Sequence, residues 1–274
     1  MSGAKCRASW PRRSASVWLL AAAGIAVGIL VYLNPVAVCA QSTGAGTQGQ
    51  SGPTASWQPP VMDNPIIGHV LFNQLEGRTN GPDNEFRWDG EGWIGTDMNR
   101  LWFKSEGFLE RGRASDGDTE ALYDRPIPFL RYFDAQAGVR YDLDSNRGRT
   151  WGAIGIQGLA PYFFEFAPTF YFSDRGRFAA KVTGSYDLLI TQRLIVQPEF
   201  EVNFYTKKDP SRGIGSGPSD LDTGLRLRYE ITRKFAPYVG FAYTQTFGDT
   251  AAFTRQESGI VHDPRFVFGA RVWY

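Results

Sequence analysis

Beyond residue 65 the chain consists of runs in which apolar and polar residues alternate with a period of two. Such alternation places successive side chains on opposite faces of a β-strand. Residues typical of turns separate the runs from one another. The predicted strands cover residues 66–76, 84–95, 99–110, 119–126, 131–142, 150–157, 162–172, 177–190, 194–207, 221–232, 236–247 and 265–274.

Residues 194–207 show the pattern most clearly. Leucine, valine and phenylalanine alternate there with polar residues that include Glu199 and Glu201. This run and the run over 221–232 exceed the about 9–11 residues that a tilted β-strand needs to cross a bilayer. The predicted strands are therefore long enough to span a membrane.

The last predicted strand ends on Tyr274, the final residue of the chain. Phe266 and Phe268 share a face with Tyr274, whereas Arg265 and Arg271 lie on the other face. A final strand that ends on an aromatic residue resembles the assembly signal of bacterial outer-membrane β-barrels. We therefore expect Tyr274 to serve assembly, with the barrel-assembly machinery as a partner.

The connections between predicted strands alternate in length near the C-terminus. Residues 191–193 and 232–234 are tight turns, whereas 208–220 and 248–264 are long loops. Outer-membrane barrels place short turns on the periplasmic side and long loops outside the cell. The pattern predicts an all-β protein, an antiparallel transmembrane β-barrel of about twelve strands in the bacterial outer membrane. About ten or eight strands are the alternatives if neighbouring segments merge.

The N-terminal segment has the order of a secretory signal peptide. Basic residues precede an uncharged apolar run over 17–33, and the small-residue site Val38-Cys39-Ala40 follows. This order predicts a signal peptide over residues 1–40, with an uncleaved membrane anchor as the alternative. Residues 41–65 are rich in Ser, Thr, Gly, Gln and Pro, which predicts a disordered periplasmic arm. The barrel is then expected over residues 66–274.

Removal of residues 1–40 changes the composition of the chain. Both cysteines, Cys6 and Cys39, lie in this segment, as do the basic residues of its first part. Because the whole chain has 29 Lys and Arg residues against 28 Asp and Glu residues, the mature protein becomes slightly acidic. No basic patch for phosphate groups is expected, so nucleic acid is not an expected partner.

The polar face of the predicted strands is strongly ionic. A barrel turns its apolar face to outer-membrane lipids and such an ionic face to the lumen. Because both signs are mixed, many of these charges should pair across neighbouring strands. A polar path or a cation site is the alternative interpretation. The expected lumenal residues are Glu85, Arg87, Asp89, Glu91, Lys104, Glu106, Asp134, Arg140, Glu165, Lys181, Asp187, Glu199, Glu201, Asp222, Arg226, Arg228, Glu230 and Arg271.

Four segments carry a resemblance to one known family: FRWDGEGWIGTDMNRLWFKSEG (86–107), RTWGAIGIQGLAPYFFEF (149–166), YDLLITQRLIVQPEFEVNFY (186–205) and DPSRGIGSGPSDLDTGLRLRYEITRKFAPYVG (209–240). They resemble the copper-resistance protein B family, outer-membrane proteins of bacterial copper-tolerance systems. The similarity runs from about Leu71 to the end of the chain. The resemblance implies an outer-membrane barrel that binds or conducts copper ions in copper resistance and homeostasis. It also implies a periplasmic copper-binding protein or oxidase of the same system as a partner.

Candidate copper ligands are few. Members of the family often carry a Met- and His-rich segment before the barrel, but residues 41–65 contain only Met62, and His69 follows just beyond. Thioether and imidazole donors suit copper(I), whereas copper(II) accepts imidazole and carboxylate oxygen. Met62 and His69 are therefore one predicted copper site, although His69 also fits a strand position without a ligand role. The alternative is a lumenal site made of Asp89, Glu91, Glu199 and Glu201.

Two other functions are alternatives to copper handling. A lipid acyl hydrolase or transferase of the outer membrane needs a nucleophile with a base in reach, commonly Ser with His. Neither His69 nor His262 lies beside an obvious serine, and His262 is expected to be solvated in its loop. We therefore do not expect an enzyme. A small general pore without metal preference is the other alternative.

Overall fold

The computed structural model describes residues 65–81, 84–110, 113–143, 148–256 and 259–274. Most of them belong to one antiparallel sheet of 13 strands. Because β9 has only two residues, twelve long strands build the sheet in this described part of the chain, as the sequence predicts. The strands are β1 (Ile67–Thr79), β2 (Asn84–Gly95), β3 (Arg100–Glu110), β4 (Arg113–Pro126), β5 (Phe133–Asp142), β6 (Arg149–Ala160), β7 (Phe164–Ser173), β8 (Arg177–Ser185), β9 (Leu188–Leu189), β10 (Leu194–Tyr205), β11 (Gly217–Tyr229), β12 (Phe235–Thr246) and β13 (His262–Trp273).

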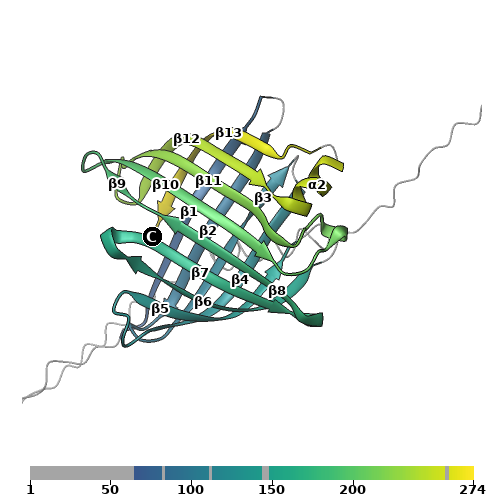
Figure 1. Ribbon diagram of the computed structural model, residues 1–274. Coiled ribbons are helices and arrows are strands. Elements are labelled where there is room, and N and C mark those ends of the chain that lie inside the picture. Colours follow the sequence, from purple (N-terminus) through teal and green to yellow (C-terminus); the bar gives the residue numbers. More distant parts are fainter. Residues whose placement is uncertain (1–64, 82–83, 111–112, 144–147, 257–258) are drawn as a thin grey trace, which may run out of the picture. The chain divides into compact units, whose positions relative to one another are not determined.

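The sheet closes on itself to form a barrel (Figure 1). Nearly every strand pairs with the strand that follows it in the chain, and β13 returns to pair with β1. At this seam the backbone of Tyr274 exchanges two hydrogen bonds with that of Val70, at 2.9 and 3.1 Å. Closure satisfies the backbone groups that an open sheet would expose along its edges.

We call the two ends of the barrel the terminal end and the loop end. The terminal end carries the start of β1, the end of β13 and the turns 190–193 and 230–234. The loop end carries the connections 206–216 and 247–261. The predicted alternation of tight and long connections is confirmed at these four places. At the loop end the connection between β7 and β8 is nevertheless only a single 3-10 turn, Asp174–Gly176.

Some predicted strand boundaries are wrong. The strand expected over 177–190 breaks after Ser185, because Pro198 on the neighbouring strand β10 has no backbone N–H to donate at this position. β1 extends to Thr79 and β4 begins at Arg113, because backbone pairing continues where the alternation of side chains is lost.

The second long connection, expected as a loop, contains the short helix α2 (Gly248–Gln256). Asp249 lies in its first turn, where a negative charge interacts favourably with the helix dipole. Among the described residues, no helix combines the length and the apolar character needed to cross a membrane.

The two faces of the barrel differ as the alternation predicts. Outward-facing phenylalanines are largely exposed, with Phe241 at 68% and Phe170 at 65% of their accessible surface. Inward-facing ionic side chains are almost fully buried, with Glu76 at 0% and Arg226 at 1%. Val267, an apolar residue on the polar face of the last strand, is also fully buried in the interior.

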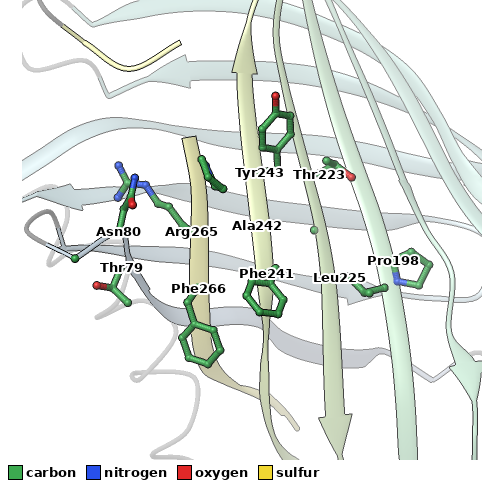
Figure 2. Close-up of a pocket in the computed structure, with 13 residues that line it drawn as sticks. Thr79, Asn80, Pro198, Thr223, Leu225, Phe241, Ala242, Tyr243, Arg265 and Phe266 are labelled. Atoms are coloured by element: carbon green, nitrogen blue, oxygen red, sulfur yellow. The ribbon is translucent and has the colours of Figure 1, made fainter. Parts of the chain in front are cut away.

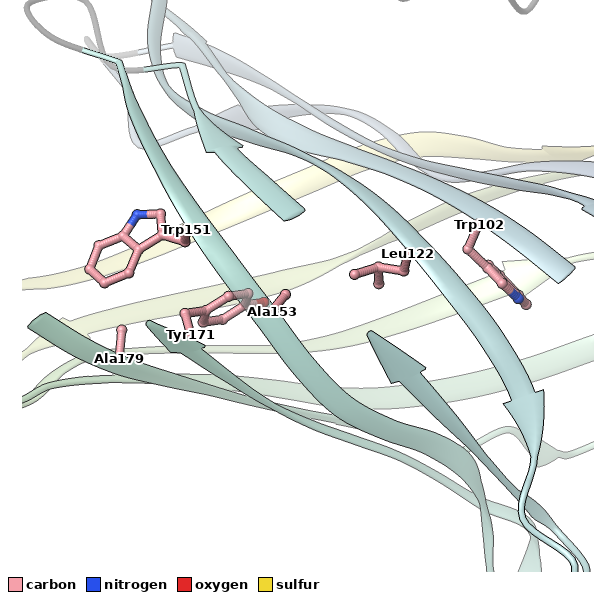
Figure 3. Packing of buried hydrophobic residues seen from close by; sticks show 6 residues of the cluster. All are labelled: Trp102, Leu122, Trp151, Ala153, Tyr171 and Ala179. Atoms are coloured by element: carbon pink, nitrogen blue, oxygen red, sulfur yellow. The ribbon is translucent and has the colours of Figure 1, made fainter. Parts of the chain in front are cut away.

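An apolar cluster lines one part of the interior (Figure 3). Its members are Trp102, Leu122, Trp151, Ala153, Tyr171 and Ala179. The polar atoms of two of its aromatic rings connect it to buried carboxylates. The Tyr171 hydroxyl donates to Glu120 at 2.6 Å, and the Trp151 indole N–H donates to Asp142 at 2.8 Å. The barrel interior is therefore one packed unit of apolar and ionic groups.

Candidate functional site

The interior of the barrel, which we call the lumen, is organised around Glu76 on β1. Arg226 on β11 donates two hydrogen bonds to this carboxylate, each at 2.9 Å. Arg78 donates a third at 2.7 Å, and the hydroxyl of Tyr238 a fourth at 3.0 Å. Four donors thus satisfy a carboxylate that is removed from solvent, as burial of a charge requires.

The network continues from Glu76 along the inner wall. Asp222 accepts hydrogen bonds from Arg78 at 2.8 Å and from Arg87 at 2.9 Å. Arg87 also pairs with Glu201 at 3.2 Å, while Arg226 pairs with Glu199. Both glutamates of the second predicted copper site are therefore already held by arginines.

A second group of charges centres on Lys181 on β8. Its ammonium contacts Glu106 on β3 and lies 3.3 Å from Asp118 on β4. Because β3 and β4 are not neighbours of β8 in the sheet, Lys181 reaches across the lumen. Arg140 on β5 pairs with Asp118 at 2.9 Å and with Asp142 at 2.8 Å. The prediction that lumenal charges pair is confirmed by these contacts, which join distant strands as well as adjacent ones.

Acidic groups predominate among the buried charges. An interior with excess carboxylates attracts cations and repels anions. Among the described residues, the buried acids are Glu76, Asp118, Glu120, Asp124, Asp142, Asp209, Asp222 and Asp263, and the buried bases are Arg78, Arg87, Lys181, Arg226 and Arg228.

Asp89 and Glu91, the other two residues of the predicted lumenal site, follow one another on the inner face of β2. Asp89 accepts a hydrogen bond from Asn73 at 3.2 Å. In the described part of the chain no hydrogen bond or ion pair reaches Glu91, whose electrostatic neighbours include Lys104 and His69. These two carboxylates are thus less tightly paired than Glu199 and Glu201.

His69 lies at the terminal end, near the start of β1. Its ring packs between Trp93 and Trp273, with centroids 6.3 and 5.7 Å away. It also lines a cavity of about 270 Å³, which we call the terminal-end cavity. The walls of this cavity are His69, Leu71, Asp187, Arg228, Glu230, Arg233, Ala236, Arg271 and Trp273. Met62, the other residue of the first predicted site, lies outside the described residues.

His262 is far from this cavity in the fold, at the loop end. Its Nδ1 lies 3.0 Å from the hydroxyl of Tyr243, and the two rings stack. Over the described ranges, no group of three or more His, Cys, Asp or Glu side chains has the arrangement of a metal site. The structure therefore does not bring the four predicted lumenal carboxylates together as a metal cluster.

A larger cavity, of about 700 Å³, lies against β10 to β13 and the end of β1 (Figure 2). Phe241 and Phe266 form part of its wall, with their rings edge to face at 5.6 Å. Both rings belong to the exposed outer face of the barrel. None of the residues that line this larger cavity is a His, Cys, Met, Asp or Glu. The cavity therefore has no side chain suited to hold a copper ion.

Several residues central to the lumen were not among those predicted from the sequence: Glu76, Arg78, Asp118, Glu120, Asp124 and Asp142. Arg78 and Asp118 fell outside the strand boundaries that were predicted too short. Glu120 and Asp124 lay within a predicted strand, in alternation with exposed Tyr123. The period of two, applied from Glu120 onward, could have identified this pair as lumenal.

Comparison with known proteins identifies the family. Residues 66–274 match the family model described as "Copper resistance protein B precursor (CopB)". Copper resistance protein B of Escherichia coli is 42% identical over 214 residues, which are 78% of this chain and 72% of that protein. A copper resistance protein B homolog of Pseudomonas syringae pv. tomato is 39% identical over 214 residues, which are again 78% of this chain and 72% of that protein. The chain belongs to this family.

Solved structures with a similar arrangement of strands are more distant in sequence. The KdgM porin is 12% identical, with a TM-score of 0.43, and the match covers 75% of this chain and 98% of that one. The NanC porin is 11% identical, with a TM-score of 0.48, and the match covers 76% of this chain and 100% of that one. Copper resistance protein B relatives, at much higher identity, are therefore the more informative comparison.

Proposed function

We propose that this protein is a barrel of the bacterial outer membrane that binds or conducts copper ions in copper resistance and homeostasis. Membership of the copper resistance protein B family supports this proposal. The exposed apolar outer face suits contact with membrane lipids. The observation that carries the proposal is the position of His69, an imidazole at the terminal end of a lumen rich in carboxylates.

We infer the orientation from the lengths of the connections. Short turns at the terminal end would face the periplasm and the long connections would face outside. The N-terminal arm over residues 41–65 would then lie in the periplasm, where a copper-binding protein or oxidase of the same system is the proposed partner. His69 would meet copper at the periplasmic mouth of the lumen.

The donors near that mouth suit weak copper binding. Imidazole binds both oxidation states, the thioether of Met62 would favour copper(I), and the nearby carboxylate of Glu91 would favour copper(II). With so few soft donors we expect about one or two ions per chain. A site at Glu199 and Glu201 would require copper to displace Arg226 and Arg87.

The decisive experiment is copper(I) titration of the purified barrel in detergent. Replacement of both Met62 by Leu and His69 by Gln should weaken copper(I) binding at least tenfold while the barrel stays folded. His262→Gln, at the opposite end, is the matched control and should bind as the parent does. Unchanged copper(I) binding in the double variant would contradict the site at Met62 and His69 and would favour the lumenal carboxylates.

A general pore is the second candidate, because the barrel closes around an interior lined by charged side chains. Cells that lack the protein separate the two proposals. Copper handling predicts altered copper tolerance and accumulation, restored by the parent chain. A general pore predicts instead a change in uptake of small solutes without a specific effect of copper.

We propose a non-catalytic role. Among the described residues no serine forms a hydrogen bond with His69 or His262, and His262 contacts Tyr243. The pairing of a nucleophile with a base, which acyl-transfer chemistry needs, is therefore not visible there.

A further inference from the structure

A closed cycle of four charges lies inside the barrel. Arg87 on β2 pairs with Glu201 on β10 at 3.2 Å and lies 3.9 Å from Glu106 on β3. Lys181 on β8 contacts the same two carboxylates, directly at Glu106 and at 3.9 Å from Glu201. Each cation therefore contacts both acids, and each acid contacts both cations. We call these four residues the charge quartet.

The charge quartet joins opposite walls of the barrel. Arg87 and Glu106 come from the paired strands β2 and β3, whereas Lys181 and Glu201 come from the paired strands β8 and β10. Between β3 and β8 lie β4 to β7 on one side of the barrel and β10 to β13, β1 and β2 on the other. Because both paths around the wall are several strands long, the contacts between the two pairs of strands pass through the lumen. None of the four residues stands at an end of its strand.

The size of the barrel makes this crossing important. Side chains fill a barrel of about eight strands, whereas about 16 to 18 strands leave an aqueous channel. Twelve long strands lie between these limits, so the interior side chains decide whether ions can pass. The side chains of Arg87 and Lys181 are only 7% and 11% exposed. The two long cations are therefore packed into the interior and do not extend into a wide water-filled channel.

The surroundings of the charge quartet are mainly acidic. Asp222 accepts a hydrogen bond from Arg87 at 2.9 Å, and Asp118 lies 3.3 Å from Lys181. Among the described residues, acids outnumber bases around the charge quartet. A gap left by either of its cations would therefore be lined mainly by carboxylates. The other charged neighbours are the acids Glu76, Asp89, Asp118, Glu199 and Asp222 and the bases Arg78, Arg140 and Arg226.

We propose that the charge quartet is a gate that closes the lumen to small ions. Salt screens buried ion pairs much less than exposed ones, so the gate should hold at physiological ionic strength. Rings of charged side chains set the selectivity of pores, and the surrounding carboxylates would favour cations once Arg87 or Lys181 is withdrawn. This inference concerns the passage of any small ion. It does not depend on copper binding at Met62 and His69.

The test is the conductance of the purified protein in planar lipid bilayers bathed in potassium chloride. The parent should show only rare and brief openings. Lys181→Cys shortens the side chain and removes its charge, and should raise the conductance several-fold with selectivity for potassium over chloride. Lys181→Arg keeps the charge and the reach and should stay closed. Lys208→Cys is the matched control, because this lysine is exposed and pairs with Asp249 outside the lumen.

Chemical restoration of the ammonium group separates a gate from a folding defect. Both native cysteines lie in residues 1–40, so the mature chain of Lys181→Cys is expected to carry a single thiol. Its thiolate attacks aminoethyl methanethiosulfonate, forms a mixed disulfide and releases methanesulfinate. The product ends in an ammonium group at nearly the reach of lysine, and should close the lumen again. The neutral methyl methanethiosulfonate should leave it open.

A variant that keeps the shape of its side chain covers the case in which Lys181→Cys does not fold. Glu106→Gln removes one of the two carboxylates shared by Arg87 and Lys181, and should open the lumen more often than in the parent. A steady current through the parent would overturn the proposal. So would a conductance unchanged by Lys181→Cys and by Glu106→Gln, or equal closure by the neutral reagent, which would assign the effect to bulk alone.

Discussion

Glu76 and Arg226 form a buried, bidentate ion pair, although the two residues are 150 positions apart in the chain. Both hydrogen bonds measure 2.9 Å, and the two side chains are 0% and 2% exposed. The pair links β1 to β11 through the interior, across the seam between β1 and β13, with β12 and β13 lying between the two strands in the sheet. It therefore joins the beginning and the end of the barrel by side chains as well as by backbone pairing.

Glu76→Gln should destabilise the barrel strongly. The substitution removes the negative charge that compensates Arg226 and Arg78, and loss of one partner of a buried pair costs about 3–5 kcal/mol. Urea unfolding of the purified protein in detergent measures the change. Asp249→Asn breaks the exposed pair with Lys208 and serves as the control, with an expected cost of about 0–1 kcal/mol. Equal unfolding midpoints for the two variants would contradict the role of Glu76.

Deletion of Tyr274 should impair assembly and not copper handling. The residue contributes two backbone hydrogen bonds to the seam with Val70, and Lys234 lies 3.9 Å above its ring. We expect less heat-modifiable barrel in the outer membrane of cells that express the shortened chain. Tyr274→Phe keeps the ring and the backbone and should assemble normally. A normal barrel level after the deletion would show that the last residue is dispensable.

Gly240→Ala should destabilise the contact between β11 and β12. A Cβ atom at this position would lie 2.2 Å from the carbonyl oxygen of Leu225, which is too close for any side chain. The strands must separate, at a cost of about 1–3 kcal/mol, typical of overpacking. Gly68→Ala is the matched control, because its Cβ would meet its nearest neighbour at an ordinary 3.7 Å. Thermal unfolding should rank the two variants in that order, and the reverse order would refute the argument.

Asp209 should attach the connection 206–216 to the barrel wall in a pH-dependent way. It is 7% exposed and pairs with Arg149 at 2.6 Å and Arg177 at 3.2 Å. Burial raises the pKa of Asp209, but hydrogen bonds from Ser211 and Arg149 and the charges of both arginines outweigh this effect. The pKa therefore lies below its usual value of 3.8.

A carboxyl group with a lowered pKa stabilises the folded form above its unfolded pKa, and the stabilisation is lost as the pH falls through the folded value. We expect Asp209→Asn to increase amide hydrogen exchange over residues 206–216 at pH 7. Well below pH 3.8, once the pH has passed through the lowered pKa of Asp209, the difference between the parent and the variant should shrink, because Asp209 then becomes neutral in the parent as well. Asp97→Asn, in a turn at the terminal end, should leave exchange in this segment unchanged. An equal difference at both pH values would argue against the ionised form of Asp209 as the attachment.

The sequence by itself determined the twelve long strands, the two faces and the alternation of connections near the C-terminus. These features are local, because each run shows its own alternation with a period of two and each turn contains the residue types that favour a turn. It also placed Glu199, Glu201, Arg226 and Arg228 correctly on the inner face. The family likewise followed from strings of residues that can be recognised without a fold.

Only the tertiary structure decided which charges meet. The partnership of Glu76 with Arg226, the reach of Lys181 across the lumen and the shared use of Asp187 by two arginines all depend on the register between strands that are distant in sequence. Register across a closed barrel is set by all its strand pairs together, and no single segment encodes it. The break after Ser185 has the same origin, because its cause is Pro198 on the neighbouring strand.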